Sequence, residues 1–127
     1  MNGLDTIRES IEALNAGESF EHLITSDFDL RVDPPMFADV AHGAVLGAEG
    51  DHLHLRLRLR ELWETPDGRA VATLTVTISD PGIGGFAIAA AAVYTLRHGR
   101  IASCHASTEI GALLADHGLE RRRERAA

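Results

Sequence analysis

The chain has 127 residues, and 45% of them are hydrophobic, so a single domain can bury a core without disulfides or a structural metal. Its formal net charge of −7 opposes attraction to nucleic-acid phosphates and to anionic membrane surfaces, and we expect neither as a partner. No stretch approaches the roughly 20 consecutive apolar residues that span a bilayer.

The beginning of the chain predicts two helices followed by a strand. Hydrophobic residues recur at helical spacing through residues 4–14, and Gly17 offers a left-handed stop after them. Ser19 can cap a short second helix over residues 20–24. From residue 27 to 33, apolar and charged residues alternate strictly, which is typical of a half-buried strand, and two prolines then end it.

The middle of the chain predicts an antiparallel meander. Residues 36–50 show no clear pattern, but in residues 52–60 leucine alternates with histidine or arginine. A helix would scatter those leucines around its circumference, so the alternation indicates a strand. Turn-forming residues separate this strand from the next three. The predicted strands cover residues 52–60, 73–78, 86–97 and 100–108.

The end of the chain predicts a last short helix and a charged tail. Ile110, Leu113 and Leu114 have helical spacing, and Gly118 marks the end of that helix. The element order predicts one α+β domain over residues 1–120, in which a curved antiparallel sheet wraps around the N-terminal helices and helices pack on one face. Residues 121–127 form the predicted C-terminal tail.

Two features bear on where the protein is found. The first residues carry acids among apolar residues and lack the basic start and continuous apolar run of a signal peptide, so we expect a cytoplasmic protein. The single cysteine, Cys104, cannot form an internal disulfide, which agrees with that location. All 12 Lys or Arg residues are arginine, which indicates a GC-rich bacterial genome.

Three short motifs carry a resemblance to a known family. They are IEALNAG at residues 11–17, RHGRI at residues 97–101 and ALLADHGL at residues 112–119. They resemble the first helix end, a hairpin and the C-terminal ending of SnoaL-like and nuclear transport factor 2-like proteins, including the ketosteroid isomerase-like branch. The resemblance covers nearly the whole chain. It implies a cone-shaped, cystatin-like fold that holds a small apolar metabolite without metal or organic cofactor, but the family's many activities leave the reaction open.

Asp33 and His105 are the candidate catalytic residues. Asp33 resembles in position the aspartate that acts as general base in ketosteroid isomerases, where it takes a proton next to a carbonyl. The donors of that site are missing, because Ser10 stands in place of the isomerase tyrosine and alanines 91–92 in place of its protonated acid. The alternatives are a strand-ending acid bonded to a turn for Asp33 and a satisfied structural histidine for His105.

Four side chains are candidates for lining the pocket. Aromatic residues commonly form the walls of apolar pockets while offering one polar group, although core packing is an alternative for the tryptophan. The candidates are His42, Trp63, Phe86 and Tyr94. Alanines alternate with larger residues on the strand face that carries Phe86 and Tyr94, which leaves room for an apolar cavity or for close helix packing.

Two other groups suggest chemistry that the sequence does not support. His52 and His54 have the spacing of two metal ligands on one strand face, but the arginines that continue that face disfavour a cation, so we expect no metal site. Cys104 and His105 are adjacent in a predicted strand and point to opposite faces, so they cannot form a nucleophile–base pair. We expect Cys104 to be a small core residue.

The sequence therefore predicts a small-molecule-binding protein that is either a carrier or a cofactor-free isomerase, cyclase or lyase acting next to a carbonyl. The alternative is a non-catalytic homodimerisation or assembly module. Its interface would be the outer sheet face, where arginines at 56, 58 and 60 lie beside threonines at 73, 75 and 77. A homodimer through this face is expected under both interpretations.

Overall fold

The computed structural model describes residues 3–33, 54–80 and 84–119, so the unassigned segment 36–50 and the predicted tail lie outside it. The elements are α1 (Gly3–Asn15), the 3-10 turn η1 (Glu21–Leu23), β1 (Ile24–Asp33), β2 (His54–Glu64), β3 (Ala70–Asp80), β4 (Gly84–Arg97), β5 (Arg100–Ser107) and α3 (Ile110–Asp116). Within these ranges, no helix is long and apolar enough to cross a membrane.

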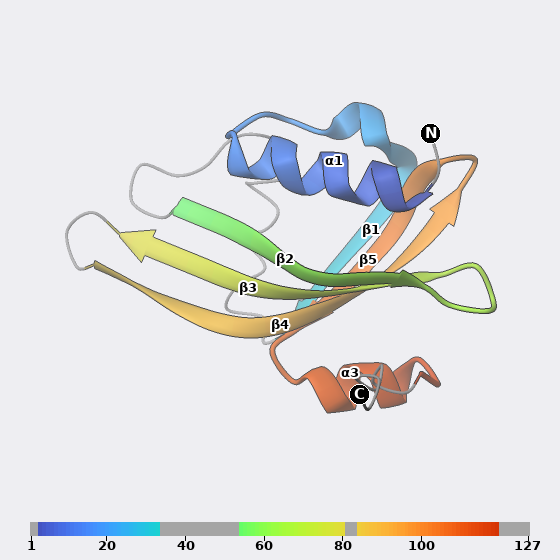
Figure 1. Ribbon diagram of the computed structural model, residues 1–127. Coiled ribbons are helices and arrows are strands. Elements are labelled where there is room, and N and C mark those ends of the chain that lie inside the picture. The colour runs from blue at the N-terminus through green and yellow to red at the C-terminus, as the bar shows by residue number, and fades with distance from the viewer. Residues whose placement is uncertain (1–2, 34–53, 81–83, 120–127) are drawn as a thin grey trace, which may run out of the picture.

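The strands form one curved sheet in the order β1-β5-β4-β3-β2 (Figure 1). The predicted meander is confirmed, because each strand from β2 to β5 pairs antiparallel with the next. β1 adds a parallel pair with β5 at one edge. Irregularities in the pairing between Leu59 and Glu61 and between Thr95 and Leu96 increase the local twist, as β-bulges do. The α+β fold class predicted from the sequence is confirmed.

Helix α1 packs on the concave face of the sheet, and its C-terminal residue fixes it there. Ile7 and Ile11 are buried against alanines of β3 and β4 and against Ile101 of β5. The side-chain amide of Asn15 donates to the Leu57 carbonyl and accepts from the Leu57 N–H, both at 2.7 Å. Leu57 lies on the edge strand β2, so Asn15 satisfies backbone groups that a neighbouring strand would otherwise pair.

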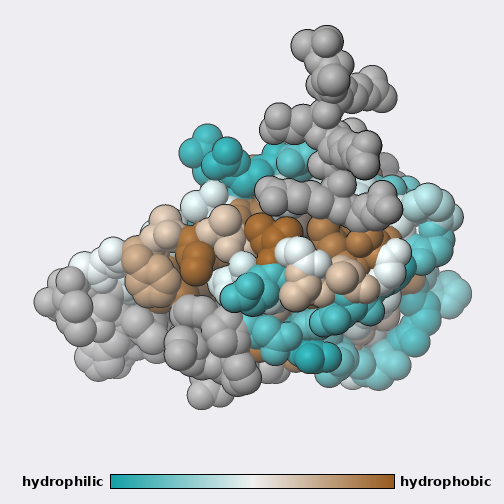
Figure 2. Space-filling view, turned by 90° about the horizontal axis from the view of Figure 1, so that it is seen from below, coloured by the Kyte–Doolittle hydropathy of each residue, from teal (hydrophilic) through white to brown (hydrophobic). Residues whose placement is uncertain are grey.

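Helix α3 lies on the opposite face of the sheet from α1 (Figure 1). The expectation that helices pack on one face is therefore wrong for this last helix. Leu113 and Leu114 are buried against Val71, Ala91 and Val93, which point outward from β3 and β4. Figure 2 looks onto this side and shows hydrophobic residues in its middle with hydrophilic residues around them. β4 is thus apolar on both faces, and its outer face needs a second cover.

The predicted second helix over residues 20–24 is also wrong in extent, because it is reduced to the turn η1. The Ser19 hydroxyl accepts a hydrogen bond from the Glu21 N–H at 3.3 Å, and Phe20 and Leu23 are buried as expected. Ile24 pairs with Ile101 of β5 instead of continuing the helix. A β-branched residue favours the strand, and the pairing with β5 decides the outcome.

Candidate functional site

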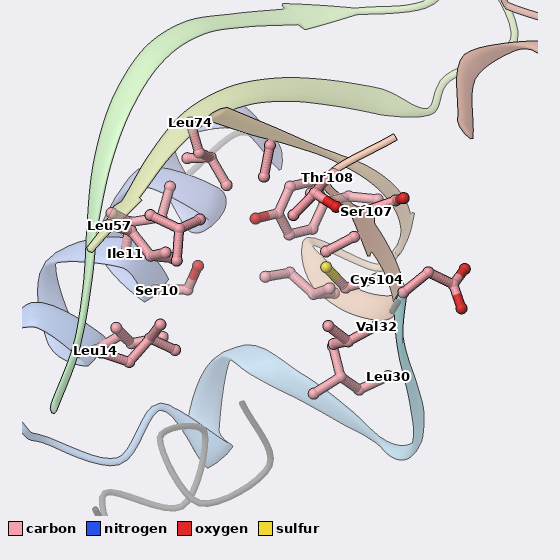
Figure 3. A pocket seen from close by; sticks show the side chains of 18 of the residues that line it. Ser10, Ile11, Leu14, Leu30, Val32, Leu57, Leu74, Cys104, Ser107 and Thr108 are labelled. Carbon is pink, nitrogen blue, oxygen red and sulfur yellow. The ribbon is translucent and has the colours of Figure 1, made fainter. Parts of the chain in front are cut away.

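A cavity of about 130 Å³ lies between α1 and the concave face of the sheet. Nearly all its walls are aliphatic or aromatic, and the residues that line it include Ile11, Leu14, Phe28, Leu30, Val32, Leu57, Leu74, Val76, Ile88, Ala90 and Ala92. In Figure 3 the labelled side chains of α1 face those of β1 across the pocket. The small side chains of Ala90 and Ala92 leave the space that larger residues of β4 would fill.

Tyr94 and Cys104 provide a polar pair in this apolar lining. They are partners across the β4–β5 ladder, and both side chains line the cavity. Burial raises the pKa of the Cys104 thiol to about 12 and raises the pKa of the Tyr94 phenol well above its ordinary value. Both groups are therefore neutral at physiological pH, and the phenol keeps a proton that it can donate.

Two hydroxyls at the edge of the cavity are already engaged within the protein. Ser10 donates to the Ile7 carbonyl of its own helix at 2.6 Å. The Ser107 hydroxyl accepts the Glu109 N–H at 3.0 Å. A thiol is a weak donor and a weak acceptor, so the neighbouring Cys104 competes little with a ligand oxygen for the Tyr94 phenol.

Asp33 borders the cavity at the end of β1, and its carboxylate forms a hydrogen bond with His105. The distance from Asp33 Oδ2 to His105 Nε2 is 2.8 Å, and the side chains are 35% and 12% exposed, respectively. This hydrogen bond is the main cause that lowers the pKa of Asp33, and Arg31 at 3.5 Å adds to it. Asp33 is ionised at neutral pH.

His105 continues this interaction on the side of the sheet that α3 covers. Its Nδ1 lies 2.8 Å from Nε2 of His117, which follows α3. Nδ1 of His117 lies 3.4 Å from a guanidinium nitrogen of Arg69. Four side chains from separate parts of the chain therefore form one row, and sequence analysis missed Arg69 and His117 because nothing in their spacing links them to Asp33 or His105.

The six predicted site residues are distributed over different places. Tyr94 and Asp33 are among the residues that line the cavity, whereas His105 points to the outer face. Trp63 packs against the outer cluster around Val71 and Val93, and it does not line the cavity. Phe86 is 51% exposed and also lies outside the lining. His42 lies outside the described residues.

The bulge in β2 explains why Trp63 lies outside the lining of the cavity. Leu59 pairs with Leu74, but Glu61 pairs with Thr73, so one residue is skipped between them. Strict alternation from residue 53 onward would place Trp63 on the inner face with the leucines. The extra residue reverses that order and turns Trp63 outward, where it packs beside Val71.

No group of three or more His, Cys, Asp or Glu residues in the described ranges could hold a metal ion. His105 and His117 bond directly to each other, so the same nitrogens do not face a shared ion. Cys104 points into the pocket while its neighbour His105 serves the other face (Figure 3). The two residues lie on opposite faces of β5, as strand alternation requires.

Comparison with known proteins gives a fold but no close relative. No family model and no curated protein matches the chain. A nuclear transport factor 2-like protein of unknown function from Burkholderia pseudomallei is similar over 84% of this chain and 89% of its own, with a TM-score of 0.68 and 18% identity. TerC, co-crystallised with polyporic acid, is similar over 92% and 96%, with a TM-score of 0.67 and 17% identity.

A proposed SnoaL-like polyketide cyclase from Jannaschia sp. CCS1 is also similar, over 82% of this chain and 83% of its own, with a TM-score of 0.60 and 12% identity. At such low identities the shared fold does not transfer the activity of any of these proteins to this chain. The shared architecture agrees with the sequence motifs at residues 11–17, 97–101 and 112–119. The chain therefore has the cystatin-like fold seen in these nuclear transport factor 2-like and SnoaL-like proteins.

Proposed function

We propose that this protein binds a small, largely apolar molecule that carries one hydrogen-bonding oxygen. The observation that carries this proposal is the Tyr94–Cys104 pair within an otherwise apolar cavity of about 130 Å³. An engineered apolar cavity of about 150 Å³ in another protein binds benzene, so the ligand expected here is about the size of one substituted ring. TerC, which has the same fold, has been co-crystallised with an organic acid.

Tyr94 is the group that would recognise the ligand oxygen. Its phenol is buried and neutral, so it can donate to a carbonyl, and the thiol beside it is too weak an acceptor to compete strongly for that proton. The surrounding hydrocarbon excludes water from this bond and strengthens it. Ligands with one acceptor should therefore bind more tightly than hydrocarbons of the same shape.

A second candidate function is proton transfer next to that carbonyl, with Asp33 as base. It is favoured by the position of Asp33 at the border of the cavity and by the hydrogen bond that holds its carboxylate. A C–H bond next to the carbonyl would break, its proton would move to Asp33, and the electron pair would shift to an enolate oxygen bound by Tyr94. Both ring nitrogens of His105 are engaged, so His105 supports the base instead of acting as one.

The reaction in this form uses no metal or organic cofactor. The proposal also includes a cytoplasmic location and a homodimer. Arg56 and Arg58 lie opposite Thr77 and Thr75, and this part of the outer face would pair with a second copy. A light-scattering mass equal to one chain at high protein concentration would contradict the dimer, and the pocket proposal does not depend on that result.

Two ligands of nearly equal shape test the binding proposal. Acetophenone has a carbonyl where α-methylstyrene has a methylene group, so their affinities differ mainly through a hydrogen bond. We expect the wild type to bind acetophenone more tightly in titration calorimetry. Tyr94→Phe should weaken acetophenone binding by about tenfold, the value of one hydrogen bond, and leave α-methylstyrene unchanged.

Two neighbouring alanines provide matched controls for the cavity itself. Ala90 lines the cavity, and Ala89 is exposed on the other face of the same strand. Ala90→Leu should abolish binding of both probes by filling the space, while Ala89→Leu should leave it intact. Equal affinities for the two probes in the wild type would contradict the role of Tyr94, and binding that survives Ala90→Leu would contradict the site.

Deuterium uptake separates a carrier from an enzyme. If Asp33 removes a proton from bound acetophenone, the wild type should catalyse exchange of its methyl protons in D₂O, as followed by NMR. Asp33→Asn should retain binding and lose the exchange, because the amide cannot accept that proton. Binding without exchange in the wild type would favour the carrier.

A further inference from the structure

A row of hydrogen-bonded side chains runs from Arg69 through His117 and His105 to Asp33. The successive nitrogen and oxygen distances are 3.4, 2.8 and 2.8 Å. The members are the residue before β3, the residue after α3, one residue in the middle of β5 and the last residue of β1. The row therefore connects the outer face of the sheet to the border of the cavity.

The two ends of the row determine the direction of every hydrogen bond in it. A guanidinium group can only donate, so Nδ1 of His117 accepts from Arg69. Nε2 of His117 then carries the proton and donates to Nδ1 of His105. Nε2 of His105 in turn donates to Asp33, whose carboxylate can only accept. All three bonds form together when each imidazole carries one proton and is neutral.

Arg69 is held in place to act as the fixed end of the row. Its guanidinium contacts both carboxylate oxygens of Asp67, with nitrogen–oxygen distances of 2.6 to 3.1 Å. Asp67 also accepts a hydrogen bond from the Thr65 hydroxyl in the same turn. The pairing lowers the pKa of Asp67 and raises the pKa of Arg69, so the donor at this end is always charged.

The surroundings of His117 oppose a second proton on its ring. Burial is the largest cause that lowers the pKa of His117, and His105, Arg69 and Arg31 also lower it, in that order. Asp116 beside it acts in the other direction. Asp33 faces His105 from β1 and is the one acid that contacts its ring in the described part of the chain. In the row, Nδ1 of His105 is occupied by His117 and Nε2 faces Asp33.

We propose that Arg69 and His117 are positioning residues: the row of hydrogen bonds holds His105 in the tautomer that donates from Nε2 to the Asp33 carboxylate at the border of the cavity. A neutral imidazole orients the carboxylate through one hydrogen bond, whereas an imidazolium would form an ion pair with it and reduce its strength as a base. The catalytic consequence rests on the proposed function, but the protonation state of His105 can be measured without any ligand.

Nitrogen-15 NMR of the imidazole rings tests this inference in the free protein. At pH 7 the wild type should show His105 with a proton on Nε2 and a bare Nδ1. His117→Phe fills the same volume but donates nothing to Nδ1. In this variant we expect the doubly protonated fraction of His105 to rise by at least about tenfold, because the adjacent carboxylate favours the cation once Nδ1 is available. The control is His22→Phe, which replaces an exposed histidine that lies 4.0 Å from Glu9. It should leave the His105 spectrum unchanged.

Arg69→Met provides a second test that keeps both histidines. It removes the fixed donor, so His117 can reverse its hydrogen bond, and we expect a second proton to enter the pair at pH 7. An unchanged His105 spectrum in Arg69→Met would overturn the inference, even if His117→Phe failed to fold. If the wild type shows neutral His105 but does not bind acetophenone, the proposed function fails and the positioning role stands.

Discussion

The two faces of the sheet use the same strands for different chemistry. On the concave face, β4 and β5 present Tyr94 and Cys104 to an apolar cavity. On the outer face, the neighbouring residues Val93 and His105 contact α3 and its following residue. Because successive strand residues point to opposite faces, one strand can line the cavity with one residue and hold Asp33 at the border of the cavity with the next.

The row on the outer face and the phenol in the cavity also differ in how their polar groups are paired. The row from Arg69 to Asp33 has a consistent donor and acceptor at each step. The cavity instead contains the Tyr94 phenol beside the Cys104 thiol, which is a weak hydrogen-bonding group. Complete pairing fixes a structure, and incomplete pairing leaves a group that can be offered to a ligand. The comparison therefore assigns binding to the concave face and positioning to the outer face.

The largest expected effect concerns Cys104 on the concave face. Its pKa is raised to about 12, so its thiolate fraction near neutral pH should be lower than that of an ordinary cysteine by about a thousandfold. We expect alkylation by iodoacetamide to be slower by a similar factor in the native protein and to become normal in urea. Cys104 is the single cysteine of the chain, so the signal has one source. Rapid alkylation of the native protein would contradict an apolar cavity.

The next effect concerns the outer face and the docking of α3. Leu114 is 2% exposed within the outer cluster, so Leu114→Ala should lower the free energy of unfolding by about 2–5 kcal/mol in urea denaturation. Ala115→Ser, at the adjacent exposed position, should change it by less than about 0.5 kcal/mol. If both variants are as stable as the wild type, α3 does not cover the outer face, and the row through His117 loses its support.

Sequence patterns predicted the fold well because they follow from local periodicity. Alternating leucines in β2 and helical spacing in α1 require no knowledge of distant contacts. The same reasoning placed Tyr94 on a face with small alanines. The partnership of Asp33 with His105 depends on the parallel pairing of β1 with β5, which no local pattern specifies. Each residue was therefore predicted as a separate candidate.

The remaining errors have equally physical causes. One skipped residue in β2 reversed the face of Trp63, and such a bulge leaves no clear mark in the alternation. Arg69 and His117 are 48 positions apart, and they meet because α3 folds back over the outer face. Tertiary packing of this kind is decided by apolar residues on β3 and β4, not by the polar residues that it brings together.

The smallest expected effect connects the outer face to pH. Burial and nearby cations lower the pKa of His117 in the folded protein below its unfolded value of about 6.5. Protonation therefore favours the unfolded chain: the contribution of neutral His117 to stability is complete above about pH 6.5 and is lost as the pH falls through the folded pKa. The lowered pKa of Asp33 acts in a separate, more acidic range, below about pH 4.

Urea midpoints at pH 7.5, 6.5 and 5.5 measure this contribution. The wild type should lose stability across the series, and His117→Phe should lose less, so that the difference between them narrows toward pH 5.5. His22→Phe should follow the wild type, because this exposed residue is remote from the row. Parallel curves for the wild type and His117→Phe would mean that His117 is protonated as easily in the folded chain as in the unfolded one. The outer face would then hold α3 through apolar contacts alone. The orientation of the Asp33 carboxylate would depend on β1 and β5 and not on the residue that follows α3.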